Sequence, residues 1–498
     1  MRAKKLFAVL MCTAMVLSLL CACTEETEDQ SSAASSEEAK VGQIFIDHLG
    51  ERNLDGFELV ILATTEKFEF GDEQFVPSEL NSEPVNDAVY ERNSIIEELY
   101  NCKLTVEYTD PYDPFVDRVT NDCLSGTISY DVLASGIATN GLASIAGNGF
   151  LYDLISLEGS NLQLDQEWWD QYAIEQLSID NRLYFVSGDI LLTDDERTCM
   201  LFFNKDLVAD NLLEDPYQLV RDGKWTLDKL HEMAIAVAKE GGDGTMDVVS
   251  GNDTWGLIGA CYDSYKLILG CGATMVNKDE NDLPVIAVTD QYNIDAFNKV
   301  FDLMTDKTRV AYLEQYYAWN DGDGGDLFYG QFYEGRALFY ASLIGSLNSA
   351  KMQDSSVQYG VLPMPKYNEE QESYCCPVDP YAFTCIAIPR DPGIDIDKVT
   401  FLLEAMGYYN STEVIPLYYE TTLKSKRLLD EESEEMLDII FSDRIVDLAN
   451  VFSWDECIQY YNRLVYGNNN GVVSYMESRR EIMQSEMDAT IELFREID

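Results

Sequence analysis

Apolar and polar residues alternate with two different periodicities along the first third of the chain, after a polar amino-terminal stretch. Short apolar or alternating runs at 57–62, 103–107 and 130–134 have the pattern of β-strands. Between them, the segments 85–101 and 114–125 place apolar residues at helical spacing. Strand, helix, strand, helix, strand in this order predicts an α/β fold with a mostly parallel sheet and covering helices.

The rest of the chain continues this alternation and then becomes helical. Further strands are predicted at 182–186, 198–203, 336–342, 357–362 and 382–388. Helices are predicted at 226–240, with Thr226 as N-cap, and at 291–304. The last hundred residues predict four more helices, at 397–409, 431–441, 455–466 and 472–497. A chain of 498 residues favours two lobes, and we interpret 188–196 as a crossing between them.

The amino terminus has the pattern of an export signal. Three basic residues at positions 2, 4 and 5 precede an apolar run at 6–20, which is short for a permanent membrane span. The run ends in LCAC, which resembles the bacterial lipobox. We therefore expect a lipoprotein signal peptide at 1–22, fatty chains such as palmitate on Cys23, and an acidic, serine-rich tether at 23–53. An ordinary secretory signal is the alternative reading.

Charge narrows the range of partners. The chain has 34 basic and 89 acidic residues, a formal net charge of -55. Nucleic acid is excluded as a partner, and anionic lipid is disfavoured, because binding phosphate requires basic surface. A neutral or cationic ligand remains compatible, although the acidic residues are also explained as a solubilising surface. Of the twelve cysteines, nine follow Cys23, and this odd number is expected to stay largely as buried free thiols.

The usual catalytic and metal-binding patterns are missing. The chain has two histidines, His48 and His231, and neither a phosphate loop nor a G-x-S-x-G turn. The acids at 321–326 do not have the spacing of a calcium loop. The run 194–196 is the most suggestive group of carboxylates, but a solvated loop explains it equally well. We predict no catalytic residue, no metal and no cofactor.

Aromatic residues beside polar ones offer a different chemistry. The chain contains 30 Tyr, 21 Phe and 6 Trp; Trp255 and Trp454 each adjoin a polar residue or glycine, and Tyr381 follows Pro380. Flat rings match the C–H face of a sugar, and carboxylates and amides match its hydroxyl edge. These residues therefore indicate a site for a neutral polyhydroxylated ligand. Packing in the core is the alternative for each of them.

Seven short motifs in a fixed order support a resemblance to a known family. They are YDVLA at 130–134, LFFNKDL at 201–207, DPY at 215–217, GKWT at 223–226, TWGL at 254–257, FYEGRAL at 332–338 and YGVLPMP at 359–365. In this order they resemble the extracellular solute-binding proteins of carbohydrate ABC importers, the broad group that includes maltose-binding protein. The resemblance implies a type II periplasmic-binding-protein-like fold, with two α/β lobes, an interlobe cleft and a hinge.

The resemblance also implies boundaries. Lobe 1 would comprise 57–189 and 381–418, and lobe 2 would comprise 198–379 and 424–498. The hinge would lie near 188–198, 378–382 and 418–424.

The resemblance further implies which residues contact the ligand, since loops at the carboxyl ends of strands face the cleft. The residues expected to bind substrate are Glu66, Phe68, Ser135, Asp194, Trp255, Ser342, Tyr381 and Trp454. In one respect the chain departs from maltose-binding protein, because SLIGS at 342–346 stands where that protein has an aromatic-rich stretch. A stacking platform is lost there, so the ligand need not resemble maltose.

We expect a monomeric, non-enzymatic binding protein, lipid-anchored on the extracellular face of the cell membrane. It would capture a sugar or oligosaccharide for the transmembrane subunits of an ABC permease by closing its lobes. A binding protein for a peptide or a cationic solute is the alternative that the net charge leaves open. An exported glycoside hydrolase or an adhesion protein is a further alternative.

Overall fold

The computed structural model describes residues 48–64, 74–138, 140–192, 195–249, 252–318, 321–424 and 430–497. The chain divides into two units, Met1–Glu51 and Arg52–Asp498, and the fold presented below belongs to the second. The predicted signal peptide, the lipidation site Cys23 and most of the tether lie outside the described residues.

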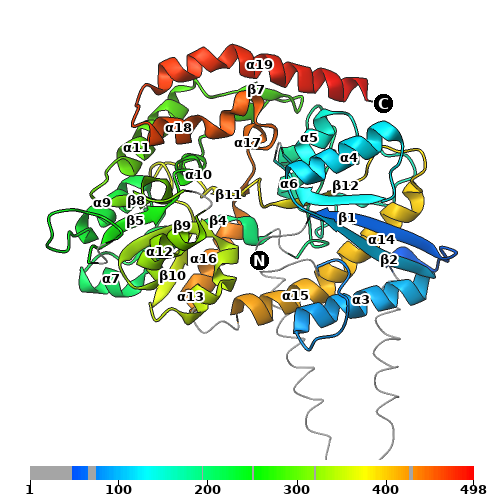
Figure 1. The fold of residues 1–498 in the computed structure, drawn as a ribbon, viewed down its shortest axis with the longest axis horizontal. Coiled ribbons are helices and arrows are strands. Elements are labelled where there is room, and N and C mark those ends of the chain that lie inside the picture. Colours follow the sequence, from blue (N-terminus) through cyan, green and yellow to red (C-terminus); the bar gives the residue numbers. More distant parts are fainter. Residues whose placement is uncertain are drawn as a thin grey trace, which may run out of the picture. The chain divides into compact units, whose positions relative to one another are not determined.

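A four-stranded sheet forms the centre of the first lobe, which we call lobe 1. Its strands are β1 (Phe57–Thr64), β2 (Cys102–Thr109), β3 (Val132–Gly136) and β12 (Thr384–Ala387), in the order β12-β3-β1-β2. β1 pairs in parallel with β2 and β3, and β12 runs antiparallel to β3. The helices α3 (Pro84–Tyr100) and α14 (Ile396–Tyr409) lie on one side of this sheet, and α4 (Asp113–Ser125) and α5 (Leu142–Gly147) on the other (Figure 1). The parallel β1–β2–β3 arrangement predicted from the sequence is confirmed.

A five-stranded mixed sheet forms the centre of lobe 2. Its strands are β4 (Cys199–Asn204), β5 (Trp255–Gly259), β8 (Val310–Tyr312), β9 (Ala337–Leu343) and β10 (Tyr359–Leu362), in the order β10-β4-β9-β5-β8. β5 is parallel to β8 and β9, whereas β4 is antiparallel to both β9 and β10. All residues of β4 and β5 are buried, as expected for strands covered on both faces.

The remaining helices cover the second sheet or lie beside the passages between the lobes, where α15 packs against α3 of lobe 1, and the short strands pair outside the two main sheets. The helices are α6 (Gln171–Leu177), α7 (Lys205–Asp210), α8 (Pro216–Arg221), α9 (Leu227–Val237), α10 (Asp263–Gly270), α11 (Gln291–Met304), α12 (Gly322–Tyr333), α13 (Ala350–Asp354), α15 (Ile415–Tyr418), α16 (Glu431–Ser442), α17 (Leu448–Phe452), α18 (Tyr460–Tyr466) and α19 (Val472–Glu496). The short strands are β6 (Val276–Lys278), β7 (Pro284–Ile286), β11 (Cys376–Pro377) and β13 (Arg444–Ile445). The predicted N-cap of α9 is confirmed, because the Thr226 hydroxyl accepts a hydrogen bond from the Lys229 amide at 3.3 Å.

Two predicted elements are wrong. Residues 182–186 are not a strand, although Val186 forms a single antiparallel bridge with Ile386. The helix predicted at 455–466 is broken, because Asp455 and Glu456 have positive φ angles of 55° and 54°. A 3₁₀ segment, Trp454–Gln459, therefore precedes α18. Apolar spacing alone did not reveal this kink.

The chain passes between the two sheets in three places. It leaves lobe 1 after the Val186 bridge and enters β4, and it returns between Val378 and β12, with Thr198 and Val378 forming a bridge that joins the two passages. After α15, the segment Tyr419–Lys424 leads toward α16, which packs against β10. The hinge positions near 188–198, 378–382 and 418–424, and hinge bending itself, remain predictions.

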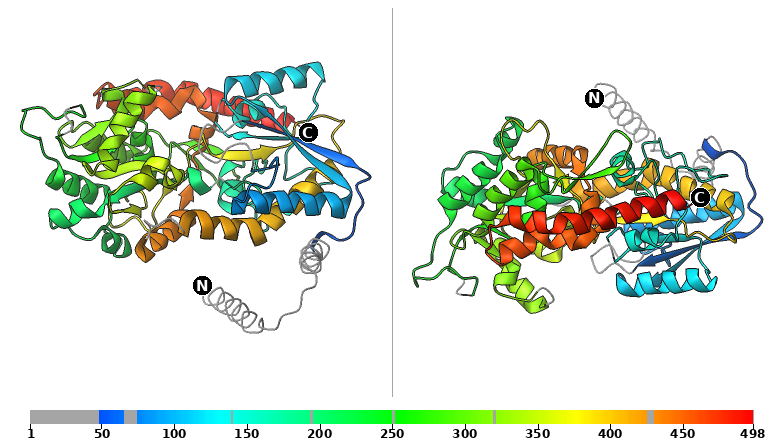
Figure 2. Two further views of the ribbon diagram at one scale, coloured as in Figure 1. Left: turned by 60° about the horizontal axis from the view of Figure 1, so that its bottom comes forward. Right: turned by 90° about the horizontal axis from the view of Figure 1, so that it is seen from above.

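The carboxy-terminal helix α19, within the range 424–498 that the resemblance assigns to lobe 2, contacts elements of both lobes. α19 packs against α11 and the 3₁₀ segment 454–459, and also against α5 of lobe 1. Near its end, the Phe494 ring lies 4.3 Å from the Tyr184 ring. Figure 2 shows the helix extending across both parts of the structure.

Candidate ligand site between the lobes

The structure separates the predicted site residues into different environments. Glu66, Phe68 and Asp194 lie outside the described residues. Ser135, near the carboxyl end of β3, is buried, and Ser342, near the end of β9, places its hydroxyl 2.7 Å from that of Ser346. Tyr381 lies on the passage back to lobe 1 and is half-buried.

Trp255 and Trp454 pack in the core. Trp255, the first residue of β5, is 0 % exposed. Trp454 is 3 % exposed, stacks on Phe452 at 5.4 Å, and donates its indole N–H to the Thr490 hydroxyl at 2.9 Å. A stacking tryptophan needs an open ring face, so the alternative that the sequence left open, packing, describes both residues in this structure.

A group of polar and aromatic side chains gathers where the chain passes between the lobes. We call it the crossing cluster, and its members are Tyr112, Tyr262, Lys266, Asp379, Tyr381 and Gln459. Tyr112 precedes α4 in lobe 1, and Tyr262 and Lys266 lie at the start of α10 in lobe 2. Asp379 and Tyr381 belong to the returning passage, and Gln459 ends the 3₁₀ segment. The cluster therefore draws on every part of the chain that meets at the crossing.

The tyrosines of the cluster lie close to one another. The rings of Tyr262 and Tyr381 meet edge to face at 6.2 Å. Tyr381 also hydrogen-bonds the Gln459 side chain, and its backbone N–H donates to Asp379 Oδ1 at 3.1 Å. The Tyr262 hydroxyl donates to Asn450 Oδ1 at 3.3 Å. The arrangement presents aromatic rings and neutral hydroxyl and amide groups together.

The buried charges of the cluster compensate one another. The Lys266 ammonium lies 3.2 Å from Asp263 and 3.3 Å from Asp379, and its side chain is only 12 % exposed. Burial disfavours the ammonium, yet the surrounding negative groups, the two carboxylates among them, hold the pKa of Lys266 above its ordinary value. Because the cation is retained between two carboxylates, the three groups leave a surplus of at most one negative charge here.

The phenols of the cluster stay protonated at neutral pH. Burial raises the pKa of Tyr262 well above its ordinary value, and the Asp379 carboxylate raises it further. Burial likewise raises the pKa of Tyr381 and of Tyr112. Each hydroxyl can therefore both donate and accept a hydrogen bond, as binding to a sugar hydroxyl requires.

Tyr112 is a candidate that sequence reasoning missed. Its backbone has φ 69° and ψ -133°, a region that glycine adopts far more readily than tyrosine. Its ring is 37 % exposed, and the charges of Asp379 and Arg197 act on its hydroxyl. Strain at a non-glycine residue that is partly open to solvent is typical of functional sites. The sequence carries no local signal for it, because TDPYDP is an ordinary turn pattern.

A second polar network holds the passage that follows Asp189. Arg444 binds Asp170, the N-cap of α6, at 2.7 Å and Asp195 at 2.5 Å, and so connects β13 both to α6 and to this passage. Glu196 is buried and accepts hydrogen bonds from the Tyr418 hydroxyl and from Asn348 at 2.5 Å. Side chains from three separate regions therefore fix this passage, as expected where two lobes are joined.

The described residues contain neither a metal-type cluster nor a membrane-spanning helix. Within the described ranges, no three His, Cys, Asp or Glu side chains are grouped as metal ligands would be. Among the helices of the same ranges, none combines the length and the apolar character needed to cross a bilayer.

Comparisons with known proteins identify the fold. No protein-family model and no curated protein matches the sequence. Among solved structures, the chain is similar to the ABC substrate-binding protein Lmo0181 from Listeria monocytogenes in complex with cycloalternan, with a TM-score of 0.56 and 14 % identity over 87 % of this chain and 100 % of that one. A cyclo/maltodextrin-binding protein complexed with maltotetraose gives 0.56 and 13 % over 87 % and 98 %.

A third similar structure has a different kind of ligand. UgpB from Mycobacterium tuberculosis, in complex with glycerophosphocholine, has a TM-score of 0.54 and 16 % identity over 88 % of this chain and 99 % of that one. At these identities the similarity establishes the fold. The described part of the chain has the two-lobe α/β architecture of ABC solute-binding proteins, as the sequence predicted.

Proposed function

We propose that this protein is an extracellular solute-binding protein that holds a neutral sugar or oligosaccharide at the crossing cluster for an ABC permease. The observation that carries the proposal is the cluster itself, where tyrosine rings and neutral polar groups gather around compensated charges. Sugars bind through stacking on rings and through hydrogen bonds to such groups. The two-lobe fold supports a binding role, and Cys23 would anchor the protein to the membrane through lipid.

Within this proposal, Tyr381 and Tyr112 supply ring faces, while Gln459 supplies an amide group. Ser135 and Ser342, at the carboxyl ends of their strands, remain proposed contacts on either side. Closure of the lobes would bring the contacts from lobe 1 and those from lobe 2 around the ligand, and the permease would recognise this closed form.

Calorimetric titration with a panel of neutral mono- and oligosaccharides tests the proposal. Once a ligand is found, Tyr381→Ala should weaken binding by about 1–3 kcal/mol, since it removes a stacking ring. Tyr381→Phe keeps the ring and should lose only the part due to the hydroxyl. Tyr292→Ala, an exposed tyrosine on α11 outside the cluster, is the matched control and should bind normally. Failure of every sugar in the panel would reject the carbohydrate proposal.

A cationic solute is the second candidate. Tyrosine rings beside the Asp379 carboxylate could surround an ammonium group, and the similar UgpB structure contains glycerophosphocholine. The Lys266 ammonium, 3.3 Å from Asp379, argues against it, because it already balances that charge. Thermal-shift screening separates the two candidates, since stabilisation by choline-type cations and not by sugars would favour the second.

A further inference from the structure

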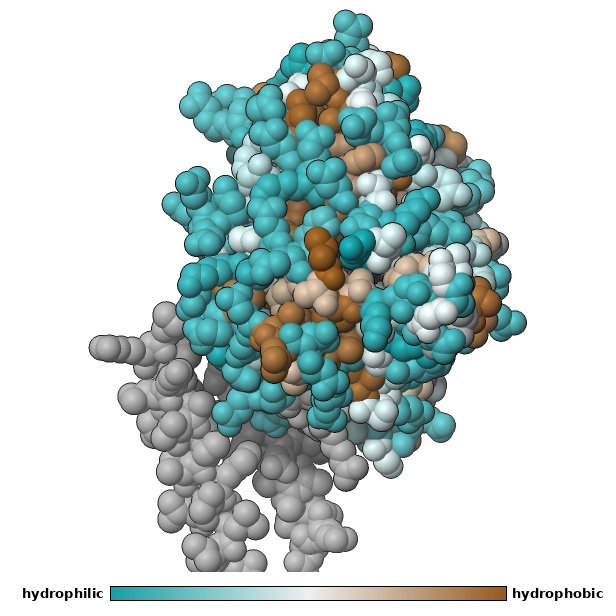
Figure 3. Space-filling model, turned by 90° about the vertical axis from the view of Figure 1, so that its left-hand side faces the viewer, coloured by the Kyte–Doolittle hydropathy of each residue, from teal (hydrophilic) through white to brown (hydrophobic). Residues whose placement is uncertain are grey.

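Lobe 2 has an open apolar groove between α7 and the start of α16. The groove measures about 540 Å³, and its apolar lining includes Phe203, Val208, Leu212, Leu213 and Pro216. Figure 3 faces the side of lobe 2 that carries α7, where hydrophobic residues reach the surface among hydrophilic ones. We call this surface the lobe 2 groove.

Leu212 at the rim of the groove is both exposed and strained. Its side chain is 91 % exposed, and its φ angle is 53°, in the left-handed region that favours glycine. It follows the end of α7, where the Leu213 amide donates back to the Val208 carbonyl at 3.0 Å. Glycine is the usual residue at this position of a helix end. A leucine here costs stability twice, through strain and through exposure, and packing within the chain does not explain it.

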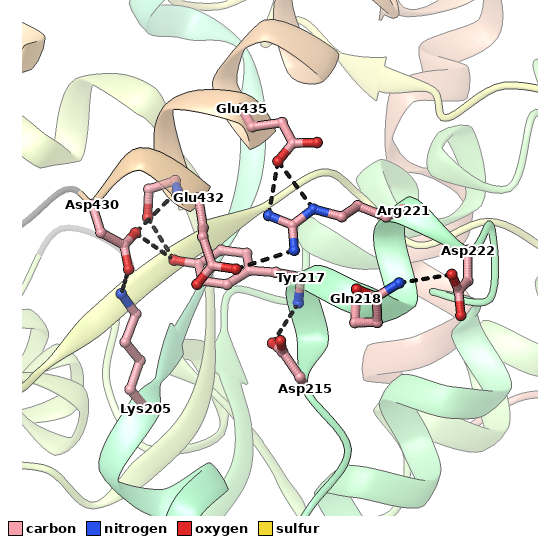
Figure 4. Close-up of polar contacts among 10 residues, drawn as sticks. Lys205, Asp215, Tyr217, Gln218, Arg221, Asp222, Asp430, Glu432 and Glu435 are labelled. Carbon is pink, nitrogen blue, oxygen red and sulfur yellow. Dashed lines mark hydrogen bonds and ion pairs between the residues drawn. The ribbon is translucent and has the colours of Figure 1, made fainter.

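Carboxylates border the groove on both sides. The α7 side carries Asp206, Asp210, Glu214 and Asp215, and the α16 side carries Asp430, Glu431, Glu432, Glu434 and Glu435. The nearby cations are already engaged, as Lys205 binds Asp430 at 2.6 Å and Arg221 binds Glu432 and Glu435 at 3.1 and 2.8 Å (Figure 4). Lys229 binds Glu214 at 2.8 Å. Among the residues that line the groove itself, the carboxylates of Asp215, Asp430 and Glu432 outnumber the one cation, Lys205, so the surplus is negative.

The polar contacts below the groove hold its walls in place. The Tyr217 hydroxyl bonds Asp430 at 3.1 Å and the Ser433 hydroxyl at 2.6 Å, which ties α8 to the start of α16 (Figure 4). Tyr217 also packs edge to face on Phe203 at 5.0 Å. The groove is therefore a built surface between α7, α8 and α16.

We propose that the lobe 2 groove docks a protein segment that carries a leucine-sized apolar side chain between lysine or arginine residues. The apolar lining would take the anchor, and the acidic borders would pair with the flanking cations. A second copy of this chain is disfavoured because its net charge of -55 would repel. An anionic lipid surface is disfavoured for the same reason.

This docking surface is separate from the crossing cluster. β4 is antiparallel to β9, with Cys199 opposite Leu343, so the groove beyond Asn204 lies at the opposite end of the sheet from Ser342. A partner could therefore occupy it whether or not a ligand is bound. The proposal does not depend on which solute the cluster holds.

Fluorescence anisotropy with a labelled peptide of one leucine between pairs of lysines tests the proposal on the exported form of the protein. Leu212→Ser should weaken binding roughly five- to tenfold, because it removes apolar contact at the anchor. Leu124→Ser, on a leucine that is 72 % exposed on α4, is the matched control and should have no effect. A peptide with serine in place of leucine should bind weakly to the wild type.

The outcome distinguishes the alternatives. Equal binding by Leu212→Ser and Leu124→Ser, or by the leucine and serine peptides, would mean diffuse attraction to an acidic protein and would overturn the proposal. A concentration-dependent dimer that Leu212→Ser abolishes would assign the groove to a second copy and would also overturn it. Leu212→Gly controls for folding defects. Glycine relieves the strain, so this variant should have a higher melting temperature and still bind the peptide more weakly.

Discussion

At the residue scale, Tyr112 combines a strained backbone with a partly exposed side chain. Its φ of 69° and ψ of -133° cost stability, and its own side chain makes no capping hydrogen bond to α4. The ring nevertheless stays partly open beside Asp379 and Tyr381. A conformation kept at a cost supports the proposal that this ring contacts the ligand.

Tyr112→Gly separates this role from a structural one. Glycine adopts the observed backbone without strain, so we expect unchanged or higher thermal stability together with ligand affinity reduced by about 1–3 kcal/mol. Differential scanning calorimetry and isothermal titration of the same sample measure both. A lower melting temperature with normal affinity would show that the ring is needed for packing.

Asp189 makes the free energy of unfolding depend on pH. Burial and the nearby Asp195 carboxylate together raise its pKa to about 8, although Arg444 opposes the shift. Burial also raises the pKa of Asp447 to about 6. The folded state therefore binds protons that the unfolded chain, with a pKa of about 4, has already lost.

The direction of the change in stability with pH follows from that difference in bound protons. Stability contributed by these groups is present near pH 5 and is lost as the pH rises towards 8, so the melting temperature should fall over this range. Asp189→Asn should flatten the curve above pH 6, and melting curves in matched-ionic-strength buffers would show it. A variant with the wild-type slope would mean that Asp189 does not titrate in this range.

At the element scale, α19 joins the two lobes. Trp454 donates to Thr490 on its lobe 2 side, and Phe494 packs on Tyr184 on its lobe 1 side. Arg495 adds an ion pair with Asp180 at 2.8 Å, which is exposed and contributes little. Apolar contact at Phe494, which is 1 % exposed, therefore carries most of this connection.

Phe494→Ala should lower the stability by about 3–5 kcal/mol, as expected for loss of a buried aromatic ring. Hydrogen exchange should increase at 183–186 in lobe 1 as well as in α19 itself. Val473→Ala, on an exposed residue of the same helix, is the control and should change neither quantity. Increased exchange limited to α19 would show that the helix does not couple to lobe 1.

At the scale of the whole molecule, charge is the dominant property. The net charge of -55 disfavours the compact state by self-repulsion, and the exposed ion pairs add little to oppose it. Raising sodium chloride from about 0.01 M to about 0.5 M should therefore raise the melting temperature, since it shortens the screening length from about 30 Å to a few ångströms. A melting temperature that falls with salt would mean that ion pairs contribute more than repulsion costs.

The local pattern correctly predicts the strands and helices that bury one regular face. The parallel order of β1, β2 and β3, the N-cap Thr226 and the bounds of α16 all followed from apolar spacing and turn residues. The kink at Asp455 and the bridge in place of a strand at 182–186 did not, because contacts with distant segments decide them.

The candidate site was less predictable than the fold. Tyr381 was expected at the crossing, where the structure places it beside Tyr262, whereas Trp255 and Trp454 turned out to be buried. Exposure of an aromatic ring depends on which helices cover it, and residue type does not encode that. Glu66, Phe68 and Asp194 stay predictions, as they fall outside the described residues.

The sequence by itself determined the α/β class and the excess of negative charge, because these follow from periodicity and composition summed over many residues, and the order of its motifs implied the two-lobe division through the resemblance to solute-binding proteins. Tertiary structure alone decided which tyrosines meet at the crossing, that Lys266 lies between Asp263 and Asp379, and that Leu212 borders an acidic groove. These features join residues far apart in the chain, and their distances are set by the packing of whole elements.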